Sequence, residues 1–214
     1  MNGFGLLLTI TEPPPALEAE FNAWYDNEHI GERLSIPGFL SARRWVADVK
    51  PGEGKYLATY ELVTPGVLQT TEYLQRLHNP SPWTKRSHDN TVFFRRWACE
   101  QINPGDAQPH MMSYAQFVAM GASPPEYEDE FNRWYDEEHI RLLSQVPGVL
   151  RARRFFDPNG KPRYVALYDL ADEAVVQHPK WQAALRTEWA WKIGELTSGR
   201  EWILRLYRNY TPGA

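Results

Sequence analysis

Residues 20–30 read EFNAWYDNEHI, and residues 130–140 read EFNRWYDEEHI. The match extends further, because Pro37-Gly38 recurs as Pro147-Gly148 and the run Ala-Arg-Arg at 42–44 recurs at 152–154. Fifteen of the twenty-six positions from 20 to 45 are identical at an offset of 110 residues. A fixed offset of about half the chain indicates a duplicated module of domain size, so the fold must be read as two copies of one unit.

The composition is that of an ordinary soluble protein, with 43% hydrophobic and 23% charged residues among 214. The net charge of −4 provides no basic surface, so we expect no nucleic-acid partner. Nine Trp and eleven Tyr favour either a core rich in aromatic rings or a pocket for a flat organic molecule. Composition alone favours the aromatic core.

A single cysteine, Cys99, excludes an internal disulfide and metal sites built on thiolates. This fits a reducing cytoplasm, which is the predicted location. The apolar run Leu6–Leu8 is predicted to belong to a strand, since it lacks the basic flank and cleavage site of a signal peptide. Because apolar runs are far shorter than a membrane span, we expect no membrane partner.

Hydrophobic periodicity and turn residues predict the order strand, helix, strand, strand, helix, strand in each half. In the first half the expected elements are strand 3–10, a helix from 16 to Pro37, strands 39–47 and 56–62, helix 67–77, an irregular segment 78–90 and strand 91–101. The second half repeats them, with strands expected at about 110–120, 149–156, 163–170 and 201–209 and helices at 125–145 and 173–194. The linker 103–106 divides the chain into domains 1–104 and 105–214.

This order is the ferredoxin-like βαββαβ motif, an α+β arrangement in which helices cover one face of an antiparallel sheet. The other face needs a cover, which the second copy can supply. We therefore predict two fused ferredoxin-like repeats that close into a barrel and enclose a ligand cavity ringed by helix ends.

The pattern Phe21, Trp24-Tyr25, His29 and then Pro37-Gly38 resembles the EthD-like branch of the dimeric α/β-barrel superfamily. Both halves carry it, so the resemblance covers essentially the whole chain and implies a fused pseudo-dimer. It implies little about the reaction, because the superfamily includes isomerases, polyketide cyclases, lyases, cofactor-free monooxygenases and haem-using members.

Two histidines are the candidate catalytic residues, His29 and His139. On a wheel of about 100° per residue, Phe21, Trp24 and Tyr25 share one arc, with Glu28 in its middle and His29 at its edge. Histidine can accept and return a proton near neutral pH. The resemblance points to the same positions, because in some superfamily members a histidine at the matching place is thought to act in the site. Equally, the repeated residues could form a hydrogen-bonded plug that fixes the helix.

The expected substrate-binding residues are Trp24, Tyr25, Glu28 and Arg44, with Trp134, Tyr135, Glu138 and Arg154 in the second copy. An arginine facing the lumen could bind a carboxylate or an enolate oxygen; an ion pair with a helix acid such as Glu28 is slightly favoured. Tyr56 and Tyr60, repeated as Tyr164 and Tyr168, could donate to an oxyanion, although a core role is favoured.

No spacing of metal ligands, phosphate loop or serine-hydrolase elbow is found, so no metal and no cofactor is expected. The prediction is a cofactor-free enzyme that performs acid/base chemistry on a small aromatic or polyketide-like metabolite, by isomerisation, cyclisation or elimination. A cofactor-free monooxygenase and a non-catalytic binding protein are the alternatives. A small-molecule substrate is the expected partner, and a homodimer of the fused chain is an option.

Overall fold

The computed structural model describes residues 3–104, 107–109 and 111–211, so residues 105 and 106 of the expected linker lie outside the described residues. It divides into two units. Unit 1 runs to Gln101 and also includes the described residues from Asn209 onward, and unit 2 runs from Ile102 to Arg208.

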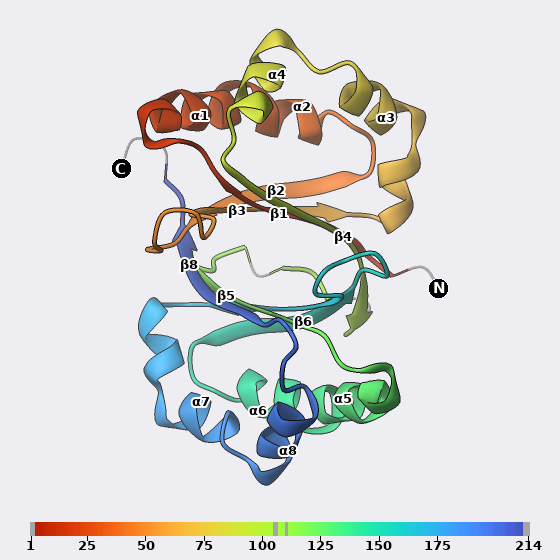
Figure 1. The fold of residues 1–214 in the computed structure, drawn as a ribbon, viewed down its shortest axis with the longest axis vertical. Helices are drawn as coiled ribbons and strands as arrows, with labels where there is room; N and C mark the ends of the chain where they lie inside the picture. The colour runs from red at the N-terminus through yellow and green to blue at the C-terminus, as the bar shows by residue number, and fades with distance from the viewer. Residues whose placement is uncertain (1–2, 105–106, 110, 212–214) are drawn as a thin grey trace. The chain divides into compact units, whose positions relative to one another are not determined.

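Unit 1 contains a four-stranded antiparallel sheet in the order β4-β1-β3-β2. Figure 1 shows its helices on one side of that sheet. The elements are β1 (Gly5–Glu12), α1 (Glu18–Trp24), η2 (Tyr25–His29), α2 (Ile30–Leu34), β2 (Phe39–Val46), β3 (Tyr56–Leu62), η3 (Pro65–Gln69), α3 (Thr71–His78), α4 (Pro82–Asp89) and β4 (Phe93–Asn103).

Unit 2 has the same order, and its sheet is β8-β5-β7-β6 with antiparallel neighbours. Its helices also lie on one side of the sheet (Figure 1). The elements are β5 (Ala115–Gly121), α5 (Glu128–Trp134), η5 (Tyr135–His139), α6 (Ile140–Ser144), β6 (Val149–Phe156), β7 (Tyr164–Leu170), η6 (Glu173–Gln177), α7 (Pro179–Ala184), α8 (Glu188–Leu196) and β8 (Ile203–Asn209).

The core of each unit lies between the helices and the sheet. Phe21, Trp24 and Tyr25 are buried against Tyr56 and Tyr60 of β3, and unit 2 repeats this packing. Burial of each large side chain contributes roughly 1.5–3 kcal/mol, so this aromatic seam anchors the long helix.

The repeated Pro-Gly pair has a structural reason. Gly38 and Gly148 have φ values of 97° and 91°, which L residues with a side chain rarely adopt. A Cβ at Gly38 would lie 2.5 Å from Val67, and one at Gly148 would lie 2.5 Å from Val175. Glycine is therefore required where the helix turns into β2 and β6.

Two helix predictions were wrong. Residues 78–90 were expected to be irregular, but α4 forms there because Ser81 caps it and Pro82 stands at its first position. The single helix expected at 173–194 is divided into η6, α7 and α8, since Pro179 and the Thr187 cap each begin a new helix. The strand expected from about 110 begins at Ala115, and residue 110 lies outside the described residues.

Candidate functional site

The repeated motif forms a π-helical turn inside the long helix of each unit, at η2 and η5. The amide of Ile30 bonds the carbonyl of Tyr25, five residues earlier. In an α-helix, residues five apart lie roughly 140° apart around the axis. The wider π turn brings Trp24 and His29 onto one face, with ring centroids 4.3 Å apart, and Trp134 and His139 are 4.2 Å apart. Such turns occur frequently at functional sites.

The π turn also corrects the helical wheel. His29 and His139 were placed at the edge of the apolar arc, but both are only 6% exposed. Glu28 and Glu138 were placed in its middle, yet both are only partly buried. An α-helical wheel cannot show this, because one extra residue per turn shifts every later position around the axis.

Burial lowers the pKa of both histidines. The pKa of His139 falls to about 3, mainly by burial and then by the charge of Arg154. The pKa of His29 lies well below 6.5, through burial and then Arg33. Both rings are therefore neutral at pH 7, and among the described residues neither Nδ1 atom has a hydrogen-bond partner.

Arg44 and Arg154 hold the helix to the sheet. Arg154 donates to Asp136 Oδ1 and Asn132 Oδ1, each at 2.8 Å, and its guanidinium lies 4.1 Å from the Tyr135 ring. Arg44 bonds Asp26 and Asn22 in the same way. The favoured ion pair with a helix acid is present, but its partner is the aspartate rather than Glu28.

Glu28 and Glu138 connect two helices. Glu28 accepts from Ser81 Oγ at 2.5 Å and from Thr84 Oγ1 at 3.1 Å, and Glu138 accepts from Thr187 Oγ1 at 2.6 Å. Ser81 and Thr187 cap α4 and α8, so each glutamate fixes the start of the second helix. Because each cap bonds the repeated glutamate, Ser81 and Thr187 occupy equivalent positions in the two units. The residues that follow them in α4 and α8 therefore also correspond in order.

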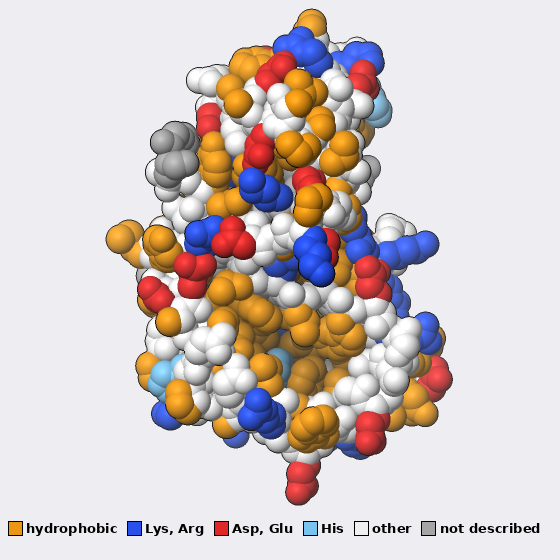
Figure 2. All heavy atoms as spheres, turned by 60° about the vertical axis from the view of Figure 1, so that its left-hand side comes forward, with side chains coloured by type: hydrophobic (Ala, Val, Ile, Leu, Met, Phe, Trp, Pro, Cys, Tyr) orange, Lys and Arg blue, Asp and Glu red, His pale blue; other side chains and the backbone are white. Residues whose placement is uncertain are grey.

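A hollow of about 470 Å³ lies between the helices and the sheet of unit 2, where Trp134, Tyr135, His139 and Tyr168 line it. Figure 2 shows a hollow lined by hydrophobic side chains, with a histidine visible within it. Apolar residues complete the walls, among them Phe117, Ala119, Leu143, Trp181, Leu185, Ala190, Trp202 and Leu204. The sequence placed the cavity inside a barrel, whereas this one lies on the helical side of the unit 2 sheet.

Unit 1 has a hollow at the equivalent place, lined by Trp24, Tyr25, His29 and Tyr60, but its volume is only about 80 Å³. Four of its lining positions carry hydrogen-bonding side chains where unit 2 has apolar ones or glycine. The pairs are Thr9 and Ala119, Arg33 and Leu143, His88 and Gly194, and Arg96 and Leu204.

Gly194 accounts for part of the larger space in unit 2. His88 of unit 1 lies edge-on to Trp24, with ring centroids 5.5 Å apart, and 6.3 Å from His29. At Gly194 a Cβ would meet no atom within 4 Å. The ring that closes the first hollow is thus missing from the second.

A second difference leaves a polar atom beside the larger hollow. Trp24 Nε1 donates to Thr84 Oγ1 at 3.0 Å. The equivalent of Thr84 is Ala190, and among the described residues Trp134 Nε1 has no hydrogen-bond partner. Tyr168 OH also lacks one among the described residues, as Tyr60 OH does in unit 1, and burial raises the pKa of Tyr168 well above 10, so the phenol stays protonated.

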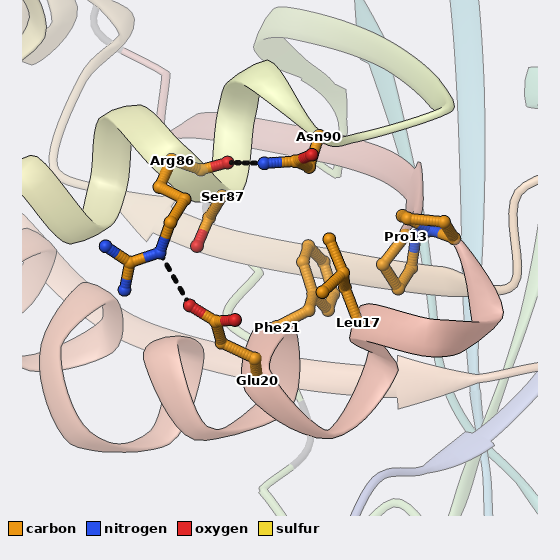
Figure 3. Close-up of a pocket in the computed structure, with 8 residues that line it drawn as sticks. Pro13, Leu17, Glu20, Phe21, Arg86, Ser87 and Asn90 are labelled. Atoms are coloured by element: carbon orange, nitrogen blue, oxygen red, sulfur yellow. Dashed lines mark hydrogen bonds and ion pairs between the residues drawn. The ribbon is translucent and has the colours of Figure 1, made fainter.

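A third hollow, of about 210 Å³, lies between α1 and α4 of unit 1 (Figure 3). Pro13, Leu17 and Phe21 line it, and the Nε atom of Arg86 donates to Glu20 at 2.7 Å. The equivalent pair in unit 2, Lys192 and Glu130, is also formed, at 2.6 Å. The bridge therefore joins two helices in both units, and we assign this hollow no chemistry.

Among the described residues, no group of three or more His, Cys, Asp and Glu side chains could hold a metal ion. In the same part of the chain, no helix has both the length and the apolar character that crossing a membrane requires.

Comparison with solved structures identifies the fold. An anthrone oxidase-like protein superposes with a TM-score of 0.66 over 99% of this chain and 92% of that protein, at 13% identity. A protein of Lactobacillus acidophilus, solved as a candidate monooxygenase, gives 0.60 over 96% and 93%, at 7% identity. A variant of chlorite dismutase from Candidatus Nitrospira defluvii gives 0.60 over 96% and 91%, at 8% identity.

The chain therefore has the fold of these proteins, with two ferredoxin-like units in each of which helices cover one face of an antiparallel sheet. No family model matches the sequence. A curated relative, core atranone cluster protein 1 of Stachybotrys chlorohalonatus, is 35% identical over 81 residues. This match covers 36% of the chain and 34% of that relative, so the chain spans about a third of the relative's length.

Sequence reasoning singled out the histidines and the rings beside them, but it missed other residues of the site. Asn22 and Asp26 are repeated and lie four residues apart, a spacing that places them on one helical face beside Arg44. Gly194, Ala190 and Arg33 differ between the halves. An alignment of the second helices, rather than of the repeated motif alone, would have exposed two of them.

Proposed function

We propose that the chain is a small-molecule enzyme whose working site is the unit 2 hollow, where it removes a proton from a flat aromatic ketone or phenol. The supporting observation is an apolar hollow of about 470 Å³ lined by Trp134, His139 and Tyr168, each of which has a buried polar atom without a hydrogen-bond partner among the described residues. Ligand sites typically measure roughly 300–1,000 Å³ and combine apolar walls with a few polar groups.

The walls favour a flat ring system. Trp134, Tyr135, Trp181 and Phe117 offer aromatic faces and edges, which pack well against an aromatic ligand. Indole and phenol donors, from Trp134 and Tyr168, are suited to a carbonyl or phenolate oxygen. Because Tyr168 keeps its proton, it can donate to an oxygen that gains negative charge.

His139 is the proposed base. It is neutral above its pKa of about 3, and the neutral imidazole is the form that accepts a proton. Burial and Arg154 make its proton affinity low in the protein alone. A substrate oxygen that becomes negative as the proton leaves would stabilise the imidazolium beside it, so the base strengthens as the reaction proceeds.

Arg154 enters this proposal as a positioning group rather than an anion binder, because its guanidinium is held by Asp136 and Asn132. Glu138 likewise fixes α8 through Thr187. In unit 1, Trp24, Tyr25, Glu28, His29 and Arg44 repeat this frame around a much smaller hollow.

The carbanion or phenolate so formed could rearrange, cyclise or eliminate, as the sequence predicts, or react directly with oxygen. Two solved neighbours are named as an anthrone oxidase-like protein and a candidate monooxygenase, which supports oxygenation as a second candidate. Both routes begin with the same proton transfer.

We further propose that the two units act as the fused counterpart of a barrel-forming dimer, within the EthD-like branch. Coverage of almost the whole chain by the solved neighbours supports the fused arrangement. So do the buried residues Leu8, Trp45 and Trp97, which alternate with core residues and therefore lie on the sheet face away from the helices. A homodimer of the fused chain remains a prediction that light scattering would test.

The test uses anthrone and 1-naphthol as substrates, with substrate loss followed by absorbance and oxygen uptake on an electrode. His139→Ala should lower kcat/KM by at least about 100-fold, the usual contribution of a positioned base. His29→Ala makes the same change in the same frame and should alter it less than about threefold.

Oxygen uptake that matches substrate loss would favour oxygenation, and turnover without uptake would favour isomerisation or elimination. Unchanged activity in folded His139→Ala protein, or equal losses in both variants, would contradict the proposal.

A further inference from the structure

The structure assigns unit 1 a second, different binding site: the hollow around Arg33 is a site for a small oxyanion, either a carboxylate or an inorganic oxyanion. This site is independent of the ligand proposed for unit 2. It lies at the equivalent position, but the residues that line it have the opposite character.

Arg33 is the central observation. It is only 5% exposed, and among the described residues its Nη1 atom has no hydrogen-bond partner. The guanidinium lies 5.4 Å from the centre of the Tyr73 ring, a contact that does not satisfy its N–H donors. A buried guanidinium without an anion is costly, because its charge loses hydration without compensation.

Other donors converge on the same hollow. Thr9 is only 8% exposed, and its Oγ1 has no partner among the described residues. Arg96, which bonds Tyr73 OH at 3.2 Å, and His88 also line the space. None of the described lining residues is acidic, so the local charge is positive.

The nearby acid, Glu32, does not neutralise this group. Its Oε1 lies 3.9 Å from Arg76 Nη1, and its Oε2 lies 4.0 Å from His29 Nδ1. Glu32 is not one of the residues that line the hollow. The charge of Arg33 is instead felt by His29 and His88, since it lowers the pKa of both.

The volume limits the ligand. About 80 Å³ holds only a few water-sized groups, which matches an anion of roughly three to five heavy atoms. A guanidinium prefers planar or tetrahedral oxyanions because it can donate two parallel hydrogen bonds. Carboxylate and phosphate-like anions meet both conditions.

Unit 2 supplies the control. At the equivalent positions it has Leu143, Leu204 and Ala119, so the same frame folds without these donors. Arg33→Leu therefore substitutes the residue that the sister unit already carries, and it should leave the fold intact.

The experiment is calorimetric titration of the whole protein with acetate, bicarbonate, phosphate and sulfate, at ionic strength held constant with sodium chloride. At least one anion should bind at one site per chain. Arg33→Leu should weaken that binding by at least about tenfold, the loss expected for hydrogen bonds to a charged group. Arg133→Leu, which removes an exposed positive charge from unit 2, should not weaken it.

The anion that binds most tightly indicates the class of the natural ligand. Acetate and bicarbonate represent a metabolite carboxylate, and phosphate and sulfate represent an inorganic anion. Binding should also raise the pKa of His88, measured from its ring resonances, since an anion offsets Arg33. If no anion binds the wild-type protein, or if Arg33→Leu and Arg133→Leu bind equally well, the site does not exist.

Discussion

Unit 1 and unit 2 have the same aromatic and histidine frame, yet their hollows measure about 80 and 470 Å³. The close contact of Trp with His, the π turn and the arginine that bonds Asp and Asn occur in both. Four exchanged positions in the walls account for the difference in character. The comparison teaches that the repeated motif builds the frame, whereas unrepeated residues set the size and polarity of each hollow.

The largest expected effect follows from closing the second hollow as the first is closed. Gly194→His should place a ring where His88 lies in unit 1 and weaken binding of 1-naphthol by about 60-fold. Displacing about 100 Å² of apolar contact costs roughly 2.5 kcal/mol, which is nearly this factor. Fluorescence titration measures it.

The reciprocal variant, His88→Gly, is the matched control. It enlarges the hollow of unit 1 and leaves the walls of unit 2 unchanged, so the affinity for 1-naphthol should not fall. Equal affinity in Gly194→His and wild-type protein would show that the ligand binds elsewhere.

The buried histidines should make stability depend on pH. The folded-state pKa of His139 is about 3 and its unfolded value is about 6.5, so the unfolded chain binds the extra proton between these pH values. Stability should fall as the pH drops from 6.5, and His139→Phe, which keeps a ring against Trp134, should reduce the slope by about 1.4 kcal/mol per pH unit.

Urea unfolding at several pH values between 4 and 7 measures this slope. His29 should continue to contribute in the single variant, so the double variant with His29→Phe should show the shallowest dependence. Identical slopes in wild-type and variant protein would mean that His139 is not buried in its neutral form.

A smaller effect is expected from the indole N–H, which has a hydrogen-bond partner in unit 1 and none in unit 2 among the described residues. Thr84→Ala should leave Trp24 Nε1 without a partner, as Trp134 Nε1 is among the described residues, and lower the free energy of unfolding by about 1–2 kcal/mol, measured by urea unfolding.

Ala190→Thr should restore the hydrogen-bond partner of Trp134 Nε1 in unit 2. It should therefore lower the affinity for ligands that carry a carbonyl by about 5–10-fold. Ligands without an acceptor should be unaffected by Ala190→Thr, and a loss of affinity for these as well would indicate steric exclusion instead.

The smallest expected effect on stability is that of the exposed ion pair between Arg86 of α4 and Glu20 of α1. Arg86→Ala removes the bond to Glu20 that Figure 3 shows, and it should change the free energy of unfolding by less than about 1 kcal/mol. A larger loss in chemical unfolding would mean that the bridge, rather than the Glu28 contacts, fixes α4.

The order of strands and helices could be predicted from the sequence, because alternating apolar residues and the Pro-Gly turns mark most boundaries. The helix α4 was missed because a proline at residue 82 suggested a break, although proline also begins helices after a serine cap. The burial of His29 was underestimated because a wheel assumes a constant turn.

The site was predictable only in part. The repeat drew attention to His29 and His139, and the ion pair favoured for the arginines is present, with Asp26 and Asp136 as partners in place of the expected glutamate. The hollow could not be predicted, since its size depends on Gly194 and Ala190, which are small residues in an ordinary helix. The unpartnered state of Arg33 emerges only from tertiary packing, which no local pattern contains.

The stoichiometry of 1-naphthol binding, measured by isothermal titration calorimetry on the whole chain, tests the functional difference between the units most directly. The account predicts one molecule bound per chain, at a site that Gly194→His removes and His88→Gly preserves. Two equivalent sites per chain, or one site that survives Gly194→His, would contradict it.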